Sequence, residues 1–196
     1  MQPIIGPAIR VTLVTLVLTG LLYPLATTGA ARLLFPRAAE GSLVTNDRGA
    51  TVGSELIGQG FSSPGYFQPR PSAAGEKGWD ATASSGSNLG PTSRKLHERI
   101  AADTVRLNKE NPSAQGEVPE ELVTTSASGL DPHVSPGAAE WQVPRVAAAR
   151  GVSEQRIRGT LQSVVEGRTL GFLGEPRVNV LLLNLALDRQ FGSLSK

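Results

Sequence analysis

A run of twenty-one uncharged residues, VTLVTLVLTGLLYPLATTGAA, occupies positions Val11–Ala31 near the start of the chain. As an α-helix this run is about 30 Å long, which matches the hydrocarbon core of a bilayer. It exceeds the roughly 7–15 apolar residues of a signal-peptide core, and only one basic residue, Arg10, precedes it. We therefore expect an uncleaved membrane anchor. A cleaved signal peptide with a site near Thr28–Ala30 is the alternative.

With this anchor, the chain is predicted to have three segments: a short N-terminal tail at 1–10, a transmembrane helix at 11–35 and a soluble domain at 36–196. Pro24 lies inside the helix and is expected to bend it, because proline removes a backbone hydrogen bond. Basic residues flank the helix on both sides, so charge bias does not orient the chain. An extracytoplasmic domain is permitted, since long domains translocate largely regardless of such charges.

The composition excludes several classes of function. The 196 residues include no cysteine, which excludes disulfides and thiolate metal sites. The net charge of +2 and the lack of a Lys/Arg run argue against nucleic-acid binding. The two histidines, His97 and His133, do not have the spacing of a zinc motif. Ser126, Ser128 and Asp131 lie near His133, but a hydrolase triad is defined by geometry rather than by crowding in sequence. We expect neither a metal site nor catalytic residues.

The soluble domain is expected to have an α+β (mixed α/β) fold. Short apolar runs on either side of Asn46–Gly49 predict a β-hairpin. Apolar periodicity predicts helices at 91–107, 136–150, 153–167 and 178–187, and a helical turn at 118–123. The apolar face of the first helix is assigned to Leu96, Ile100, Ala101, Val105 and Leu107.

The segment Ser126–Gly151 is the most closely specified part of this domain. Ser135 is expected to cap a helix whose first residue is Pro136, and Gly151 is expected to end that helix in a left-handed conformation. Before the cap, Asp131 and His133 flank a proline. We expect them to hold a turn through hydrogen bonds to backbone amides rather than to act in catalysis.

Two other segments offer candidate contact residues. Tyr66–Ser72 combines aromatic residues with prolines, which favours a local core beneath a loop, and its Arg70 is a weak candidate for binding an anion or carboxylate. Ser84–Asn88 has the small polar residues with which a loop presents backbone amides to an anion. No Gly-Lys-Ser/Thr follows, so this is not a Walker A sequence, and a flexible polar loop is the alternative.

The order of these motifs resembles the KdpC family, the C subunit of the bacterial Kdp potassium-transporting ATPase, over essentially the whole chain. Two departures concern the loop before the first predicted helix: Ser85 stands where a second glycine is common, and Trp79 stands where a tyrosine is common. The segments that carry the resemblance are the N-terminal span, 53–59, 66–73, 85–91, 122–136 and 174–188.

The resemblance implies a non-catalytic accessory subunit in the bacterial inner (plasma) membrane, with a single span and an extracytoplasmic domain. The implied partners are a channel-like potassium-translocating subunit, a P-type ATP-hydrolysing subunit and a very small fourth subunit. The implied role is to stabilise or assemble the complex, and to act as a catalytic chaperone that raises the ATP affinity of the ATP-hydrolysing subunit. No tightly bound cofactor is implied. ATP is reached through the ATP-hydrolysing subunit, and potassium is the transported ion.

The resemblance also suggests where nucleotide contact is made. The residues carried over for nucleotide contact are Ser85, Gly86, Ser87 and Asn88. The residues expected at a partner interface or a structural turn are Tyr66, Phe67, Arg70, Asp131, His133, Glu175 and Arg177. A domain that faces outward does not meet cytoplasmic ATP, so a structural role ranks above direct nucleotide contact. A stand-alone anchored domain that binds an anion or solute through Ser84–Asn88 is the alternative function.

Overall fold

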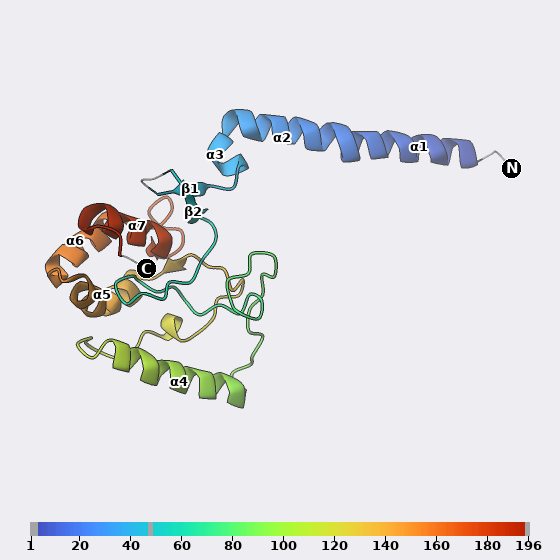
Figure 1. The fold of residues 1–196 in the computed structure, drawn as a ribbon. Helices are drawn as coiled ribbons and strands as arrows, with labels where there is room; N and C mark the ends of the chain where they lie inside the picture. The colour runs from blue at the N-terminus through green and yellow to red at the C-terminus, as the bar shows by residue number, and fades with distance from the viewer. Residues whose placement is uncertain (1–3, 47–48, 195–196) are drawn as a thin grey trace. The chain divides into compact units, whose positions relative to one another are not determined.

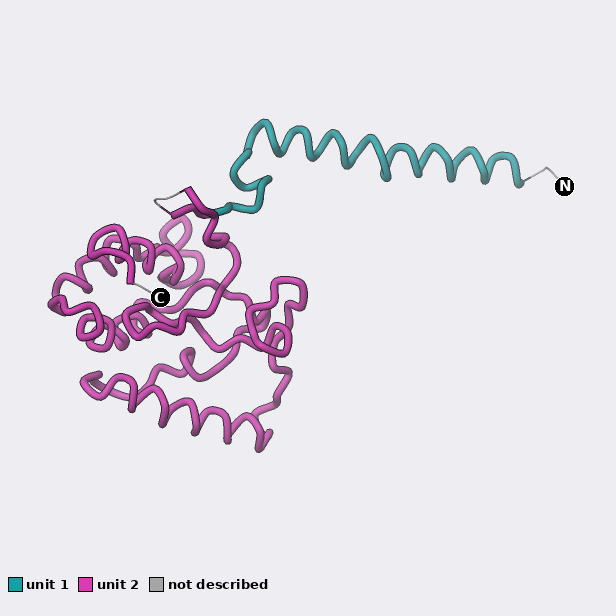
Figure 2. The backbone as a smooth tube through the Cα atoms, in the orientation of Figure 1, with its two compact units in different colours: residues 1–43 teal, residues 44–196 magenta. Residues whose placement is uncertain are grey.

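The computed structural model describes residues 4–46 and 49–194, and the chain divides into two compact units, residues 1–43 and 44–196 (Figure 2). In the first unit, helix α1 (Ile5–Val17), a π-helical turn η1 (Leu18–Leu22) and helix α2 (Tyr23–Leu34) form one continuous helix (Figure 1). It has 30 residues, an 18-residue stretch of it has a mean hydropathy of 1.9, and none of its residues is buried, so it is long and apolar enough to cross a membrane. The short helix α3 (Pro36–Ala39) follows it.

The membrane-type helix begins at Ile5, six residues before the uncharged run, because Arg10 does not interrupt helical geometry. Just before Pro24, where a bend is predicted, the helix contains the π-helical turn η1. Proline has no N–H to donate to the carbonyl one turn earlier, and the wider turn accommodates that missing bond. Thr19 and Thr27 donate their hydroxyls to the carbonyls of Thr15 and Tyr23, at 2.8 and 2.9 Å. These polar groups are therefore satisfied within the helix itself.

The second unit contains two small sheets. Strands β1 (Leu43–Thr45) and β2 (Thr51–Ser54) pair, which confirms the hairpin, although Asp47 and Arg48 of its loop lie outside the described residues. Strands β3 (His133–Val134), β5 (Arg177–Asn179) and β4 (Val165–Glu166) form the other sheet in that order. Its register is antiparallel, with Val178 opposite both Val134 and Val165.

Four helices and a 3₁₀ turn surround these strands: α4 (Arg94–Glu110), η2 (Glu120–Leu122), α5 (Pro136–Arg150), α6 (Glu154–Ser163) and α7 (Val180–Phe191). Helices α5, α6 and α7 pack side by side, and α4 lies along the opposite edge of the unit (Figure 1). The core forms where α5, α6 and α7 meet the three-stranded sheet. Its fully buried apolar side chains include Phe67, Val143, Val146, Ile157, Leu161, Val178, Leu183 and Leu187.

Helix α5 has the predicted bounds. The Ser135 hydroxyl accepts the Ala138 amide at 3.1 Å, and Gly151 adopts a φ of +65° beyond the last turn. The 3₁₀ turn η2 lies inside the predicted helical turn at 118–123. Helix α7 is buried as predicted, but it begins only at Val180, where the Asn179 side chain accepts the Leu182 amide at 3.2 Å.

Two other helix predictions were wrong in part. The helix from Ser153 ends at Ser163, because Val165 pairs with β5 in a strand instead of continuing the helix to Gly167. Helix α4 begins at Arg94 rather than at Pro91, and of its predicted apolar face Ala101 and Val105 are exposed, Val105 by 70%, whereas Leu107 is buried. The buried face of α4 follows steps of three and four residues to Leu107, and Val105 lies two residues away, on the other side.

A segment without regular helix or strand, residues 64–68, lies against α5 and α7, and we call it the strap. The Asn184 side chain accepts the Phe67 amide at 2.8 Å and donates to the Phe67 carbonyl at 3.0 Å. Gln142 makes the same two bonds to Gln68, at 2.8 and 3.1 Å. Side-chain amides thus take the place of a neighbouring strand, so that the strap's buried backbone groups are paired.

Two arginines of α5 complete this support. Arg145 donates to the carbonyls of Pro64 and Tyr66, at 2.6 and 3.0 Å. Burial lowers the pKa of Arg145 to about 10, and the carbonyls it faces carry no compensating charge. Arg150 donates to the Gly65 carbonyl at 2.7 Å. The strap is therefore fixed against the helices, and the segment that follows it is positioned by this attachment.

Candidate functional site

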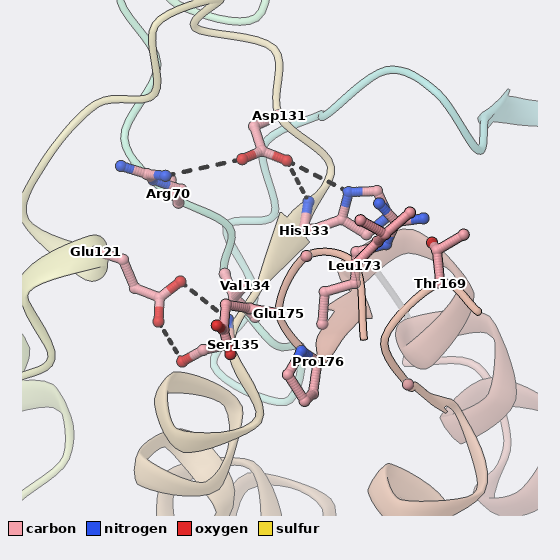
Figure 3. Close-up of a pocket in the computed structure, with 13 residues that line it drawn as sticks. Arg70, Glu121, Asp131, His133, Val134, Ser135, Thr169, Leu173, Glu175 and Pro176 are labelled. Carbon is pink, nitrogen blue, oxygen red and sulfur yellow. Dashed lines mark hydrogen bonds and ion pairs between the residues drawn. The ribbon is translucent and has the colours of Figure 1, made fainter. Parts of the chain in front are cut away.

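A cleft of about 360 Å³ opens beside β3 and the β4–β5 connection. It brings together five of the seven residues predicted at a partner interface or structural turn: Arg70, Asp131, His133, Glu175 and Arg177. They come from three segments that are far apart in the sequence, at 70, 131–133 and 175–177. Figure 3 shows Arg70, Asp131 and His133 along one wall, and the connection that carries Thr169, Leu173 and Glu175 on the other side.

Asp131 is the centre of the first wall. One of its carboxylate oxygens accepts the backbone amide of His133 at 3.0 Å and lies 3.4 Å from the His133 Nδ1 (Figure 3). The other lies 3.7 Å from an Arg70 guanidinium nitrogen. The His133 side chain, then its backbone amide, holds the pKa of the Asp131 carboxyl below its usual range, although burial opposes this shift. Asp131 is therefore a carboxylate that fixes the start of β3.

Arg70 lies just after the strap, which determines its position. It also donates to the Thr125 carbonyl at 3.3 Å. Its side chain is 27% exposed and that of Asp131 is 31% exposed, so this ion pair is half-buried at the cleft surface. Asp131 makes the predicted hydrogen bond to a backbone amide, that of His133, and its ion pair with Arg70 links it to the segment that follows the strap.

Glu121, at the base of the cleft, was not singled out in the sequence. Its carboxylate accepts the Ser135 backbone amide at 2.9 Å and the Ser135 hydroxyl (Figure 3). A negative charge is thereby placed at the N-terminus of α5, where the helix dipole stabilises it. The two residues are fourteen positions apart, beyond the reach of local capping patterns, so no sequence signal identified Glu121.

Two cleft residues from the β4–β5 region, Arg177 and Glu175, form further ion pairs with residues next to the cleft. Arg177 donates to Glu166 at 2.9 Å across the β4–β5 ladder. Arg168 donates to both carboxylate oxygens of Glu175, at 3.0 and 2.8 Å. These four side chains are all substantially exposed. The cleft therefore presents charges of both signs that are already paired, an arrangement suited to exchanging ion pairs with a polar protein surface.

The remaining predicted interface residues, Tyr66 and Phe67, lie in the strap and do not line this cleft. Phe67 is fully buried and belongs to the core. The Tyr66 hydroxyl donates to Asp188 at 2.8 Å, and the Arg150 guanidinium lies over the Tyr66 ring at 5.0 Å from its centre. Both side chains thus act in folding the strap onto α5 and α7.

The serine-glycine loop, Ser84–Asn88, packs against the loop at residues 126–129. A Cβ placed on Gly86 lies 2.9 Å from the Ala127 carbonyl oxygen, which is closer than real side chains approach. The Ser84 hydroxyl donates to the Ser128 carbonyl at 3.0 Å. Gly86 therefore allows two backbone segments to approach each other. Ser85, Ser87 and Asn88 lie on the same loop, and Asn88 adopts a φ of +51°.

The serines near His133 act locally in the structure. The hydroxyls of Ser126 and Ser128 accept the backbone amides of Gly129 and Leu130, at 3.0 and 3.1 Å, and so stabilise their own loop. Within residues 4–46 and 49–194, no group of three or more His, Asp or Glu side chains could hold a metal ion.

Comparison with known proteins identifies the family. A sequence model described as "KdpC: K+-transporting ATPase, c chain" matches residues 5–189. The chain is similar to proteins named "Potassium-transporting ATPase KdpC subunit" in three bacteria. It is 67% identical over 187 residues to that of Myxococcus xanthus, covering 95% of this chain and 88% of that protein. It is 53% identical over 196 residues to that of Bradyrhizobium diazoefficiens (94% and 96%), and 56% identical over 182 residues to that of Nitratidesulfovibrio vulgaris (91% and 92%). The matches cover both the apolar N-terminal helix and the unit that contains the cleft, and the chain belongs to the KdpC family of potassium-transporting ATPase subunits.

Proposed function

We propose that this chain is a non-catalytic accessory subunit that stabilises the potassium-transporting complex by docking its soluble unit on the ion-translocating subunit. The observation that carries the proposal is the charged cleft. Arg70, Asp131, His133, Glu175 and Arg177 come from distant segments, yet they line one surface. The other partners are the P-type ATP-hydrolysing subunit and the small fourth subunit. The α1–α2 helix anchors the chain in the plasma membrane beside them.

The chemistry of the cleft fits recognition better than catalysis. Its wall pairs, Arg168–Glu175 and Arg177–Glu166, are exposed and therefore contribute little to the stability of the free chain. Such pairs can be exchanged for charges on a partner at small cost, and they then select the partner and its orientation. A stabilising subunit needs this kind of surface, together with an anchor that keeps it near its partner.

We further propose that the soluble unit lies outside the cytoplasm and raises the ATP affinity of the ATP-hydrolysing subunit without touching the nucleotide. A unit outside the cytoplasm does not meet cytoplasmic ATP, so the effect passes through the membrane subunits. The packing of Gly86 against Ala127 supports this proposal, because the fold itself requires a glycine at this position, without any nucleotide contact. In energetic terms, the accessory subunit favours the conformation of its partners that binds ATP more tightly.

Charge reversal in the cleft tests the docking proposal. The full-length tagged chain, carrying Arg177→Glu, is purified in mild detergent from potassium-starved membranes that contain the other subunits, and the recovered partners are quantified. Replacing the Arg177–Glu166 attraction with a repulsion is expected to reduce partner recovery about tenfold or more. The matched control is Arg94→Glu on α4, whose side chain is 91% exposed and pairs with Glu98.

Normal recovery of the ion-translocating subunit with Arg177→Glu would remove the cleft from the interface. Recovery of the wild-type chain alone, under conditions that preserve another membrane complex, would overturn the accessory-subunit proposal itself. An equal loss of partner recovery with Arg177→Glu and Arg94→Glu would show a general effect of charge, and would also contradict docking through the cleft.

A further inference from the structure

The connection between β4 and β5 exposes an unusual concentration of apolar surface. Leu170 is 79% exposed, Phe172 is 68% exposed and Leu173 is 49% exposed. In the described part of residues 44–196, the only other exposed large apolar side chains are Leu56 and Val105, which are far from one another in the sequence. Isolated exposed apolar residues are ordinary, but three within four residues indicate a binding surface. We call residues 169–173 the apolar tip.

The apolar tip is a defined turn. The amide of Thr169 donates to the Leu173 carbonyl and the amide of Leu173 donates to the Thr169 carbonyl, both at 2.9 Å. The Gly171 amide donates to the Arg168 carbonyl at 3.0 Å, which closes the base of the turn. Exposure of the three side chains is therefore built into the backbone. A surface held in its binding shape in this way loses less entropy when a partner arrives.

Leu170 adds a second, independent observation. Its φ is +55°, in the left-handed region that favours glycine and disfavours a residue with a Cβ. Gly171 and Gly174 take positive φ values nearby, but at Leu170 the side chain is retained in spite of the backbone strain. Burial within this chain does not compensate for the strain, because Leu170 is 79% exposed. Strained backbone of this kind is typical of functional sites.

The surrounding charges favour a protein over a lipid surface as the occupant. Membrane-binding loops attract anionic headgroups with arginines and lysines that are free to contact them. Here Arg168 is paired with Glu175 and Arg177 is paired with Glu166, so the rim of the apolar tip carries no net charge. An apolar centre inside a rim of paired polar groups is the usual composition of a protein–protein interface.

The apolar tip is also continuous with the charged cleft, since Thr169 and Leu173 line both. Three side chains alone are too few for an independent interface, which typically buries about 1,200 Å² or more. The membrane-type helix removes that difficulty for one class of partner. A protein embedded in the same membrane meets the apolar tip at a high effective concentration, so a small contact contributes usefully.

We propose that the apolar tip is a docking knob that inserts into an apolar pocket on the extramembrane surface of the ion-translocating subunit. This inference rests on the proposed function and identifies the part of the soluble unit that supplies the apolar contact. Phe172 and Leu170 enter the pocket, and the paired arginines and glutamates meet its polar rim.

Site-specific photocrosslinking tests the occupant directly. Phe172 is replaced by p-benzoylphenylalanine in the full-length chain, within native membranes that contain the other subunits. The expected result is a covalent adduct with the ion-translocating subunit. The same replacement at Val105, which is 70% exposed on α4, is the matched control and is expected to give no such adduct. Adducts only with lipid, only with a second copy of the chain, or at both positions equally would overturn the proposal, as would no adduct at either position.

A second measurement separates this proposal from the proposed function. Phe172→Ser is expected to weaken association with the other subunits about thirtyfold, the effect of losing one interface hot spot, with the melting temperature of the free chain unchanged. Val105→Ser is expected to leave association unchanged. If the wild-type chain brings down the other subunits and Phe172→Ser does so equally well, the docking knob is wrong and the accessory role stands. If the wild-type chain brings down none, both proposals fail.

Discussion

Replacing Asn184 with alanine should destabilise the unit at residues 44–196 strongly, although only one polar side chain of helix α7 is removed. Its side chain is 2% exposed and pairs with both backbone groups of Phe67, which is itself fully buried. Asn184→Ala leaves a buried N–H and a buried C=O without partners, at a cost of about 1–3 kcal/mol each. The higher helix propensity of alanine offsets about 0.5 kcal/mol of this loss in the free energy of unfolding. The expected net loss is about 2–5 kcal/mol.

The loss can be measured by urea unfolding of the full-length chain in mild detergent, followed by tryptophan fluorescence. Both tryptophans, Trp79 and Trp141, belong to the soluble unit, and Trp141 is buried. In a thermal scan, the same loss lowers the melting temperature by about 4–20 °C for a unit of this size. Asn108→Ala on the exposed side of α4 is the control and should change stability by less than about 0.5 kcal/mol. A loss below about 1 kcal/mol for Asn184→Ala would refute the idea that this amide replaces a neighbouring strand.

Three further predictions concern the loops around the cleft. Ser87→Ala should leave unchanged both the melting temperature of the chain and the apparent KM of the assembled complex for ATP. Gly86→Ala should lower the stability of the chain. A raised KM for Ser87→Ala at an unchanged melting temperature would instead indicate nucleotide contact. Since the pKa of Asp131 is lowered in the folded chain, its contribution to stability is present above about pH 4 and is lost as the pH falls through the folded pKa. Asp131→Asn should therefore lower the free energy of unfolding at neutral pH, and the gap between variant and wild type should narrow as the pH falls below about 4. A gap that stays constant between neutral and acidic pH in unfolding experiments would contradict this. Ser135→Ala should cost about 1–3 kcal/mol in urea unfolding, because it removes the helix cap and one hydrogen bond to the Glu121 carboxylate, and no measurable loss would show that the cap is dispensable.

Local signals in the sequence predicted the elements that depend on nearby residues. Ser135 and Gly151 mark the two ends of α5, and the structure places the cap and the left-handed glycine there. The boundary at Val165 could not be found in this way. A β-branched residue after a helix is compatible with either state, and pairing with Val178 thirteen residues later selected the strand.

The support of the strap was beyond the reach of sequence patterns for the same reason. Asn184 and Phe67 are 117 positions apart, and an asparagine in an apolar run carries no sign of which backbone it will pair with. The cleft was partly anticipated. Arg70, Asp131 and Glu175 were among the candidates predicted from the sequence, but their meeting in one cleft depends on the strap and on the β3–β5 pairing.

The serine-glycine loop shows why a residue pattern alone does not distinguish two functions. A phosphate-binding loop and a tightly packed loop both need glycine, since both bring another group close to a bare backbone. The two kinds of loop differ in the chemical group that lies against the glycine backbone. At Gly86 the approaching group is the Ala127 carbonyl oxygen, and a Cβ placed on Gly129 would clash with the Ser85 carbonyl oxygen. Carbonyl oxygens repel an anion, whereas phosphate sites present N–H groups. The glycines of these two loops thus serve the contact between them.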